Sequence, residues 1–344
     1  MTSALSENKT ASRLRLSGFP WRRALPFLRL AMTVVMVYVL FAKVQWASVD
    51  QIGRRGIGFI AVAFALTLAG IFLSGVRWRS VLASMEVPSR VRDLVELQLA
   101  GMFAGNFMPS TVGGDIVRAT WLAKINKASA DSAASVVLER LTGWLVLPVL
   151  VLVGTITDPS LLRLGGVSKL ILLIAVATLV GLAVLITVAG SSSLSARASR
   201  IHVLAVLLRS MGRGISNLQR KPAVLARLIT WAVLYQVCVL VASIFAARAL
   251  NIEIGWRALL VFVPTVAMLQ VLPLTIGGLG VREGALVLML HPLGIGSAQA
   301  IAFGLLVYAL NIGASLLGAP TLALGSGRMS QRGAGAADAG TDDR

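Results

Sequence analysis

The sequence predicts an all-α polytopic integral membrane protein. Of its 344 residues, 57% are hydrophobic and 13% are charged, and the mean hydropathy is +0.84. The apolar stretches are close to the roughly 20 residues that a helix needs to cross a bilayer, and they lack the alternation of a transmembrane barrel strand. One short motif also occurs twice. Together these observations exclude a globular enzyme as the fold class.

Six apolar stretches are long enough to be full membrane spans. They cover residues 28–46, 57–76, 134–156, 170–190, 225–249 and 296–323. Residues 1–27 are basic and rich in Ser, and the first stretch has no convincing cleavage site, so we expect a cytoplasmic N-terminal segment followed by an uncleaved signal-anchor. Residues 324–344 are rich in Gly, Ala and Asp, which is typical of a disordered tail.

The repeated motif lies in two further apolar regions, 93–117 and 258–292. Its copies are Pro109-Ser-Thr-Val-Gly-Gly-Asp-Ile-Val-Arg118 and Pro273-Leu-Thr-Ile-Gly-Gly-Leu-Gly-Val-Arg282. Because proline and paired glycines interrupt helices, we expect each region to enter and leave the membrane on the same face, as a re-entrant helical hairpin. The alternative is that each region is an ordinary kinked span, which gives eight spans in all.

Six spans and two hairpins divide the membrane domain, residues 28–323, into halves with the same plan, 28–156 and 170–323. The halves start on opposite sides of the membrane, so they form an inverted repeat of the kind found in transporters with a site at the midplane. Most of the 32 Lys and Arg residues then fall on the side of the N-terminus, Arg77 among them, which places both termini in the cytoplasm. The same bias explains the net charge of +18 without nucleic-acid binding.

The breaks in the two motifs predict a site for a lipid headgroup. Paired glycines leave backbone N–H groups unpaired where a helix restarts, and that end of a helix attracts anions. An arginine about one turn further on can hold a phosphate through two parallel hydrogen bonds. The predicted headgroup residues are Asn106, Pro109, Gly113, Gly114, Arg118, Pro273, Gly277, Gly278, Gly280 and Arg282. The alternative is that the glycines only permit close packing and the arginines extend to the interface.

Further charged residues near the motifs predict a charge network. They are Asp115, Glu139, Arg140 and Glu283. Asp115 lies three residues before Arg118 and can pair with it on one helix face. Glu283 directly follows Arg282 and needs a partner from elsewhere, which the pair Glu139-Arg140 could supply. Such a network either gates transport or locks the two halves together.

Metal, redox and nucleotide chemistry have little support. His202 and His291 are isolated and Cys238 is the single cysteine, so neither a metal site nor a disulfide framework is expected. Gly277-Gly-Leu-Gly280 lies in an apolar region rather than between a strand and a helix, so it predicts no dinucleotide site or P-loop. We expect no cofactor and no catalytic residue, and a transporter rather than an enzyme.

Three segments resemble the lysylphosphatidylglycerol synthase transmembrane-region family, also called the flippase-like domain family. They are residues 106–118, 137–141 and 272–285, of which the last is the most specific, and the resemblance runs from residue 25 to residue 325. One departure is Gly143, where the resemblance implies an acidic residue four positions after Glu139. The best-known relatives also carry a soluble aminoacyltransferase domain, and we expect none in this chain.

The resemblance implies a bacterial or archaeal membrane protein that moves lipids between leaflets. We therefore expect a stand-alone lipid translocase of the bacterial inner membrane that moves a lipid with an anionic headgroup or a lipid-linked precursor. Its expected partners are membrane lipids and envelope-lipid biosynthetic proteins. One alternative is a membrane-embedded transferase that acts on a phosphate-bearing or polyprenyl-linked lipid, and another is a non-transporting accessory subunit of envelope-lipid biosynthesis.

Overall fold

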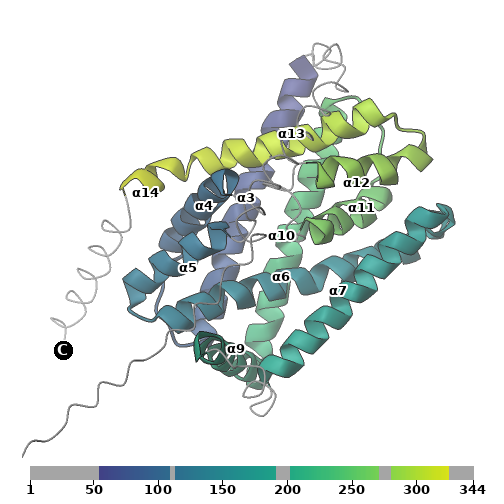
Figure 1. Ribbon diagram of the computed structural model, residues 1–344. Coiled ribbons are helices and arrows are strands. Elements are labelled where there is room, and N and C mark those ends of the chain that lie inside the picture. The colour runs from purple at the N-terminus through teal and green to yellow at the C-terminus, as the bar shows by residue number, and fades with distance from the viewer. Residues whose placement is uncertain (1–53, 109–112, 191–201, 271–279, 325–344) are drawn as a thin grey trace, which may run out of the picture.

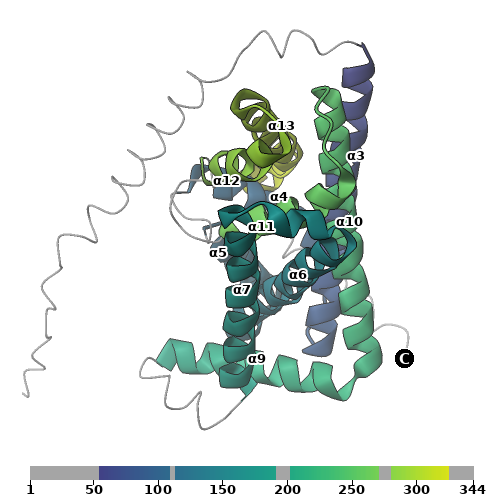
Figure 2. The same ribbon diagram turned by 90° about the vertical axis from the view of Figure 1, so that its right-hand side faces the viewer.

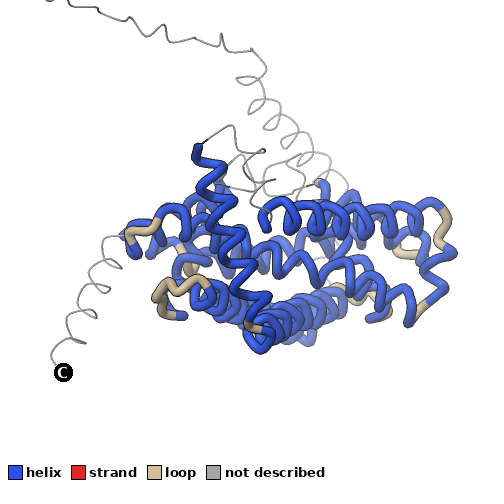
Figure 3. Tube along the Cα trace, turned by 90° about the horizontal axis from the view of Figure 1, so that it is seen from below, coloured by secondary structure: helices blue, strands red, loops and turns tan. Residues whose placement is uncertain are grey.

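The computed structural model describes residues 54–108, 113–190, 202–270 and 280–324, and nearly all of this trace is helical (Figure 1 and Figure 3). Its α-helices are α3 (Arg54–Ser84), α4 (Val91–Phe107), α5 (Gly113–Asn126), α6 (Ser129–Thr157), α7 (Gly166–Gly190), α9 (His202–Arg220), α10 (Pro222–Ala249), α11 (Trp256–Leu269), α12 (Val281–Leu290), α13 (Ser297–Leu316) and α14 (Ala319–Leu324). Two short 3-10 helices are η1 (Pro159–Arg163) and η3 (His291–Leu293). The described ranges contain no strand, which confirms the predicted all-α class.

Five helices, α3, α6, α7, α10 and α13, are long and apolar enough to cross a membrane. They coincide with five of the six predicted spans, and the sixth, residues 28–46, lies outside the described residues. The outward face of α7 exposes Leu173, Val176 and Val180 by 53–64%. Such a row of apolar side chains is unfavourable in water and suits contact with lipid. The described residues are thus those of a polytopic helical membrane protein.

The last span is shorter than predicted. We expected one helix over 296–323, but α13 ends at Leu316 and α14 begins at Ala319. Gly318 lies against α4, where an added Cβ would be 2.5 Å from the backbone nitrogen of Ala100. Pro320 falls in the first turn of α14, where its missing N–H is tolerated. The glycine allows the close approach to α4, and the proline fits a new helix start better than a helix interior.

Each motif region forms two short helices in place of one long helix. The first consists of α4 and α5, and the second of α11 and α12. Met108, which precedes Pro109 and follows α4, has extended backbone angles (φ −90°, ψ 140°), as expected before a proline. Gly101 and Gly105 of α4 both pack against Gly114 at the start of α5. The two helices of this first motif region therefore run antiparallel as a helical hairpin.

A helix that was not predicted lies in the segment between the spans α7 and α10. Figure 2 shows α9 running crosswise to α3 and α10 at one end of the molecule. Its buried apolar side chains, which follow the helical repeat, are Leu208, Met211, Ile215 and Leu218, and its exposed side chains include Arg209, Arg213 and Arg220. The segment is thus an amphipathic helix whose apolar face packs on the bundle, rather than a loop.

The two halves contact each other in a reciprocal way. Helix α3 of the first half runs beside α10, its counterpart in the second half (Figure 1 and Figure 2). Helix α4 contacts α13, while α11 contacts α6. In each case a motif helix from one half contacts the last long helix of the other half. The space between the motif helices is therefore bordered by both halves.

Candidate functional site

Five charged side chains from α3, α5 and α6 meet inside the first half. This ion-pair cluster consists of Arg77, Asp115, Arg118, Glu139 and Arg140. Positive and negative side chains alternate along the series of ion pairs, which runs from Arg77 to Glu139, Arg118, Asp115 and Arg140. With three arginines against two carboxylates, the cluster carries a net charge of one positive unit. An arginine stands at each end of the series.

Glu139 is the central acceptor of the cluster and is only 2% exposed. Its Oε1 pairs with Arg77 and accepts a hydrogen bond from Ser74 Oγ at 3.0 Å. Its Oε2 lies 3.3 Å from Nη2 of Arg118. A buried carboxylate is unfavourable unless it is paired and hydrogen-bonded, and here three donors satisfy that need. Glu139 therefore joins α3 and α5 through α6.

Asp115 joins the other two arginines. Its Oδ1 lies 3.3 Å from Nη1 of Arg118, which confirms the pair predicted from their spacing on one helix. Its Oδ2 lies 2.5 Å from Nε of Arg140. The Arg140 side chain is 44% exposed, and within the described residues its terminal nitrogens make no ion pair. Arg140 is thus the member of the cluster that is most accessible to a ligand.

Aromatic rings hold two of the arginines in place. The guanidinium of Arg118 lies 4.2 Å from the ring of Trp78, and that of Arg77 lies 5.4 Å from the ring of Tyr235 in α10. The indole N–H of Trp78 donates a hydrogen bond to Ser135 Oγ at 3.0 Å, which fixes the ring. A cation over an aromatic face is stabilised by the ring quadrupole, most of all in a desolvated site. These contacts orient the guanidinium groups without neutralising them.

Gly143 makes room for Arg77. A Cβ atom at this position would lie 2.8 Å from Nη1 of Arg77 and 3.2 Å from its Cζ. Gly143 follows Glu139 by about one helical turn, so both positions face the same guanidinium. The family resemblance implies an acidic residue at position 143. Here the position is a glycine, and the absence of a side chain leaves room for Arg77 to reach Glu139. Arg77 keeps Nε and Nη1 buried without a hydrogen-bond partner among the described residues.

The second motif has its own, smaller group of polar contacts. Gly280 precedes α12 with φ of 83°, a left-handed conformation that favours glycine, and its N–H donates to Oε2 of Glu283 at 2.5 Å. Oε1 of the same carboxylate lies 3.6 Å from Nε of Arg282. The Arg282 guanidinium lies 4.7 Å from the ring of Tyr308 in α13. This helix start is therefore already capped by a carboxylate of the protein itself.

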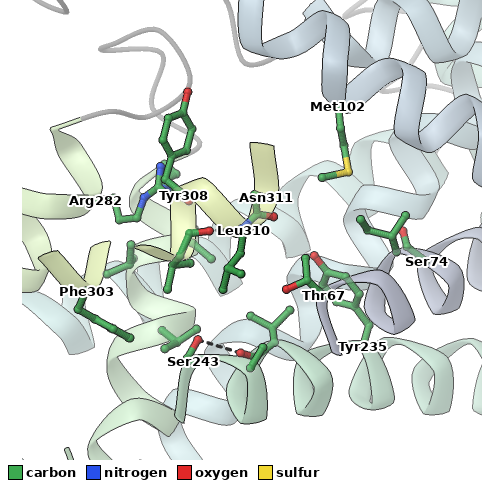
Figure 4. A pocket seen from close by; sticks show the side chains of 18 of the residues that line it. Thr67, Ser74, Met102, Tyr235, Ser243, Arg282, Phe303, Tyr308, Leu310 and Asn311 are labelled. Atoms are coloured by element: carbon green, nitrogen blue, oxygen red, sulfur yellow. Dashed lines mark hydrogen bonds between the residues drawn. The ribbon is translucent and has the colours of Figure 1, made fainter. Parts of the chain in front are cut away.

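Two adjoining cavities lie between the halves. The Arg118 cavity, of about 500 Å³, reaches every member of the ion-pair cluster, and the Arg282 cavity, of about 340 Å³, reaches Arg282 and Tyr308. Six polar side chains line both cavities: Ser74, Gln98, Asn106, Tyr235, Gln270 and Asn311. Figure 4 shows the Arg282 cavity, with side chains entering it from α3, α10 and α13. Both volumes fall in the range of natural ligand pockets.

The structure brings part of the predicted headgroup site together. Asn106, Gly114 and Arg118 line the Arg118 cavity, while Arg282 lines the Arg282 cavity. Gly113 and Gly280 are buried but line neither cavity. The two motif arginines thus occupy the walls of neighbouring cavities. Four predicted residues, namely Pro109, Pro273, Gly277 and Gly278, lie outside the described residues.

Two details of the prediction were wrong. Glu283 finds its partners locally, in Gly280 and Arg282, and not in the pair Glu139-Arg140. The charge network also joins helices of the first half alone, so its described ion pairs do not lock the halves together.

Sequence reasoning also missed several residues of the site. Arg77 was counted with the cytoplasmic charges, yet it is 5% exposed and lies within α3. The predicted span ended one residue before it, although an apolar stretch continues beyond Arg79. Polar side chains of the cavities were missed as well, among them Ser74, Gln98, Tyr235, Gln270, Tyr308 and Asn311. Single polar residues inside predicted spans were the available signal.

Residues 27–318 match the family described as the lysylphosphatidylglycerol synthase TM region. The chain belongs to this family. The matched residues include every described residue that lines the two cavities. The search of curated proteins found no match. The family and the helical membrane architecture both fit a membrane protein with a lipid-related role.

Proposed function

We propose that the protein is a lipid translocase that moves a lipid with an anionic headgroup across the bacterial inner membrane. The observation that carries the proposal is the pair of adjoining cavities between the halves, with Arg140 in the wall of one and Arg282 in the wall of the other. A headgroup that moves from one cavity to the other meets a guanidinium in both. Guanidinium groups bind phosphate through charge-assisted hydrogen bonds, which are stronger than neutral ones.

The reciprocal contacts between the halves support an inverted repeat. The pairing of α3 with α10, and the exchange of contacts between motif helices and last long helices, are what a pseudo-two-fold axis in the membrane plane requires. In this arrangement each motif region is a re-entrant hairpin, and the two enter from opposite faces. Both termini are then cytoplasmic. A site between the halves is accessible from either side when the halves move relative to each other.

Arg140 and Arg282 are the residues that should contact the phosphate. Arg118 already holds Asp115 and Glu139, whereas Arg140 is partly exposed and Arg282 has a single carboxylate 3.6 Å away. The role of Arg118 is then to keep the carboxylates away from the headgroup. This division of roles differs from the predicted site, in which Arg118 itself binds the phosphate.

The test is lipid translocation in vesicles that contain the purified protein. The measurement is the fraction of acyl-labelled fluorescent phosphatidylglycerol that a membrane-impermeant quencher reaches with time. We expect Arg140→Gln and Arg282→Gln each to slow translocation by about tenfold or more, the loss of one charged hydrogen bond. Arg248→Gln is the control, because Arg248 also stacks on an aromatic ring, at 5.9 Å from Phe245, but lines neither cavity.

Three results would contradict the proposal, each in a different way. Wild-type vesicles that expose labelled lipid no faster than empty vesicles would show that the protein is no translocase for this lipid class. The same slowing by Arg248→Gln as by Arg282→Gln would show that net charge, and not the cavity, governs the rate. Normal rates in both cavity variants would show that transport does not depend on Arg140 and Arg282, and would remove the observation on which the proposal rests.

A further inference from the structure

The cavities present hydrogen-bond acceptors that a phosphate cannot satisfy. Thr67 and Ser243 line the Arg282 cavity, and each donates its hydroxyl proton to a backbone carbonyl of its own helix at 2.8 Å. Ser74 lines both cavities and donates to Glu139. With their protons engaged, these hydroxyl oxygens can only accept. A phosphate diester also only accepts, so it can satisfy the arginines but not these oxygens.

Two amide oxygens are left as acceptors by the hydrogen bonds around them. Asn311 donates from Nδ2 to the carbonyl of Val307 at 2.8 Å, which fixes the nitrogen toward α13 and leaves Oδ1 directed away from it (Figure 4). Asn106 donates from Nδ2 to Ser315 Oγ at 2.9 Å, and Ser315 in turn donates to the carbonyl of Ile312 at 2.7 Å. Because Ser315 has no second proton, Asn106 must be the donor, and its Oδ1 remains without that partner.

Gln98 adds an acceptor that is already buried. Its Oε1 has no hydrogen-bond partner among the described residues, although Gln98 lines both cavities. A buried polar atom without a partner is destabilising, so a ligand that supplies the missing donor is favoured. The three amide oxygens and the hydroxyl oxygens thus all require a ligand that donates hydrogen bonds.

Hydroxyl groups meet this need better than an ammonium group. The carboxylates that line the Arg118 cavity, Asp115 and Glu139, are each already paired with two arginines, and the cluster as a whole is positive. A ligand cation would be repelled by Arg140 and Arg77 without gaining a free carboxylate. A neutral hydroxyl supplies a donor without a charge penalty.

We infer that the substrate headgroup is polyhydroxylated as well as anionic: a phosphate that carries a polyol or a sugar, with no ammonium group. The inference rests on the proposed function and deepens it. The phosphate meets Arg140 or Arg282, and the hydroxyls donate to the oxygens of Gln98, Asn106 and Asn311 and to the hydroxyl oxygens of the cavity wall.

Binding to the purified protein in detergent tests this inference apart from transport. The probes are short-chain phosphatidylinositol, phosphatidylglycerol and phosphatidylmethanol, which share one phosphate charge while the number of headgroup hydroxyls falls to zero. Tryptophan fluorescence reports binding, because Trp144 lines the Arg118 cavity. We expect phosphatidylinositol and phosphatidylglycerol to bind about tenfold more tightly than phosphatidylmethanol, the effect of one or two neutral hydrogen bonds. Phosphatidylethanolamine should bind no better than phosphatidylmethanol.

Matched variants test whether the preference for hydroxylated headgroups arises at Thr67 and Asn311. Thr67→Val and Asn311→Leu should reduce the preference for hydroxylated headgroups about fivefold, whereas Thr67→Ser should keep it. Thr120→Val is the control, because Thr120 also donates to a carbonyl one turn earlier, at 2.7 Å, but lies exposed on α5 outside both cavities. Glycerophosphoglycerol, which has the same headgroup and no acyl chains, should bind far more weakly. If glycerophosphoglycerol bound as tightly as phosphatidylglycerol, the ligand would be a free phosphate ester rather than a lipid.

Equal dissociation constants for the three anionic lipids, or no binding of any of them, would overturn the inference. Tight binding of phosphatidylethanolamine would overturn it too, by showing that an ammonium group supplies the donors. A protein that prefers hydroxylated headgroups but moves no lipid in vesicles would retain this specificity and lose the proposed transport function. The two failures are therefore distinguishable.

Discussion

Glu139 is the residue on which the ion-pair cluster depends most. It is the one contact of Arg77 with a carboxylate in the described structure, and one of two such contacts of Arg118. Removing one partner from a buried pair leaves the other as an uncompensated charge, which costs far more than the pair contributes. Two arginines would be affected here. The acidic residue therefore matters for folding before it matters for any ligand.

Glu139→Gln keeps the size of the side chain and removes its charge. We expect it to lower the free energy of unfolding by about 3–5 kcal/mol, the range for breaking a buried pair. Asp131→Asn is the control, because Asp131 pairs with Arg213 at the surface, and it should change stability by less than about 1 kcal/mol. The measurement is chemical unfolding in detergent, and equal losses in the two variants would contradict this account.

Sequence spacing predicted some residue contacts and not others. The pair of Asp115 and Arg118 follows from helical periodicity, since three residues bring side chains onto one face. The contact of Arg77 with Glu139 joins residues 62 positions apart, which no local rule covers. Gly143 was noticed as a departure from a family pattern, but its role depends on where Arg77 lies. Contacts between helices need the packing, and the packing is set by many side chains together.

Among the helices, α4 and α5 depend on close approach of their backbones. A Cβ on Gly101 would lie 2.8 Å from the carbonyl oxygen of Gly114, and a Cβ on Gly114 would meet the carbonyl of Gly101. Small residues are favoured at helix contacts in membranes for this reason. The packing role of Gly114, which the sequence left as an alternative, is therefore supported by the structure.

Gly114→Ala should destabilise the hairpin of α4 and α5. The added methyl group has no space, so we expect a loss of about 1–3 kcal/mol in thermal or chemical unfolding. Gly58→Ala in α3 is the matched control, because nothing lies within 4 Å of a Cβ at Gly58. Alanine favours helix over glycine, so this control should be neutral or slightly stabilising, by up to about 1 kcal/mol. A stabilised Gly114→Ala would indicate a different hairpin packing.

Long helices were easier to predict than short ones. A run of apolar residues near bilayer length predicts a span from composition alone, and five of the predicted spans are helices here. Helix α9 was missed because its apolar residues are spaced on one face and its arginines lower the overall hydropathy. The break at Gly318 was missed because its cause is a contact with α4, far away in the sequence.

For the whole molecule, the re-entrant topology makes a sharp prediction. In a Cys238→Ala background, single cysteines at Arg90 and Lys124 flank the first hairpin, and both should react from the cytoplasmic side with a membrane-impermeant thiol reagent. Glu253→Cys and Ser297→Cys flank the second hairpin and should both react from the outside. All four positions are exposed in the structure. If the two positions around either hairpin react from opposite sides, that region is a full span and the inverted repeat is wrong.

The glycine contact inside the first hairpin also bears on how the molecule can move. Gly101 and Gly114 meet backbone to backbone, and the Arg118 side chain beside them is held by two carboxylates and the Trp78 ring, so α4 and α5 should shift as one stiff unit. Where α3 meets α10, by contrast, the Tyr235 ring packs on the bare backbone of Gly70, where an added Cβ would lie 3.5 Å from the ring, and such a contact lets one helix slide past the other. We expect the seam between α3 and α10 to be the hinge. Each cavity arginine would then move together with its helix. The angle between the two halves of the molecule would control the passage of a lipid.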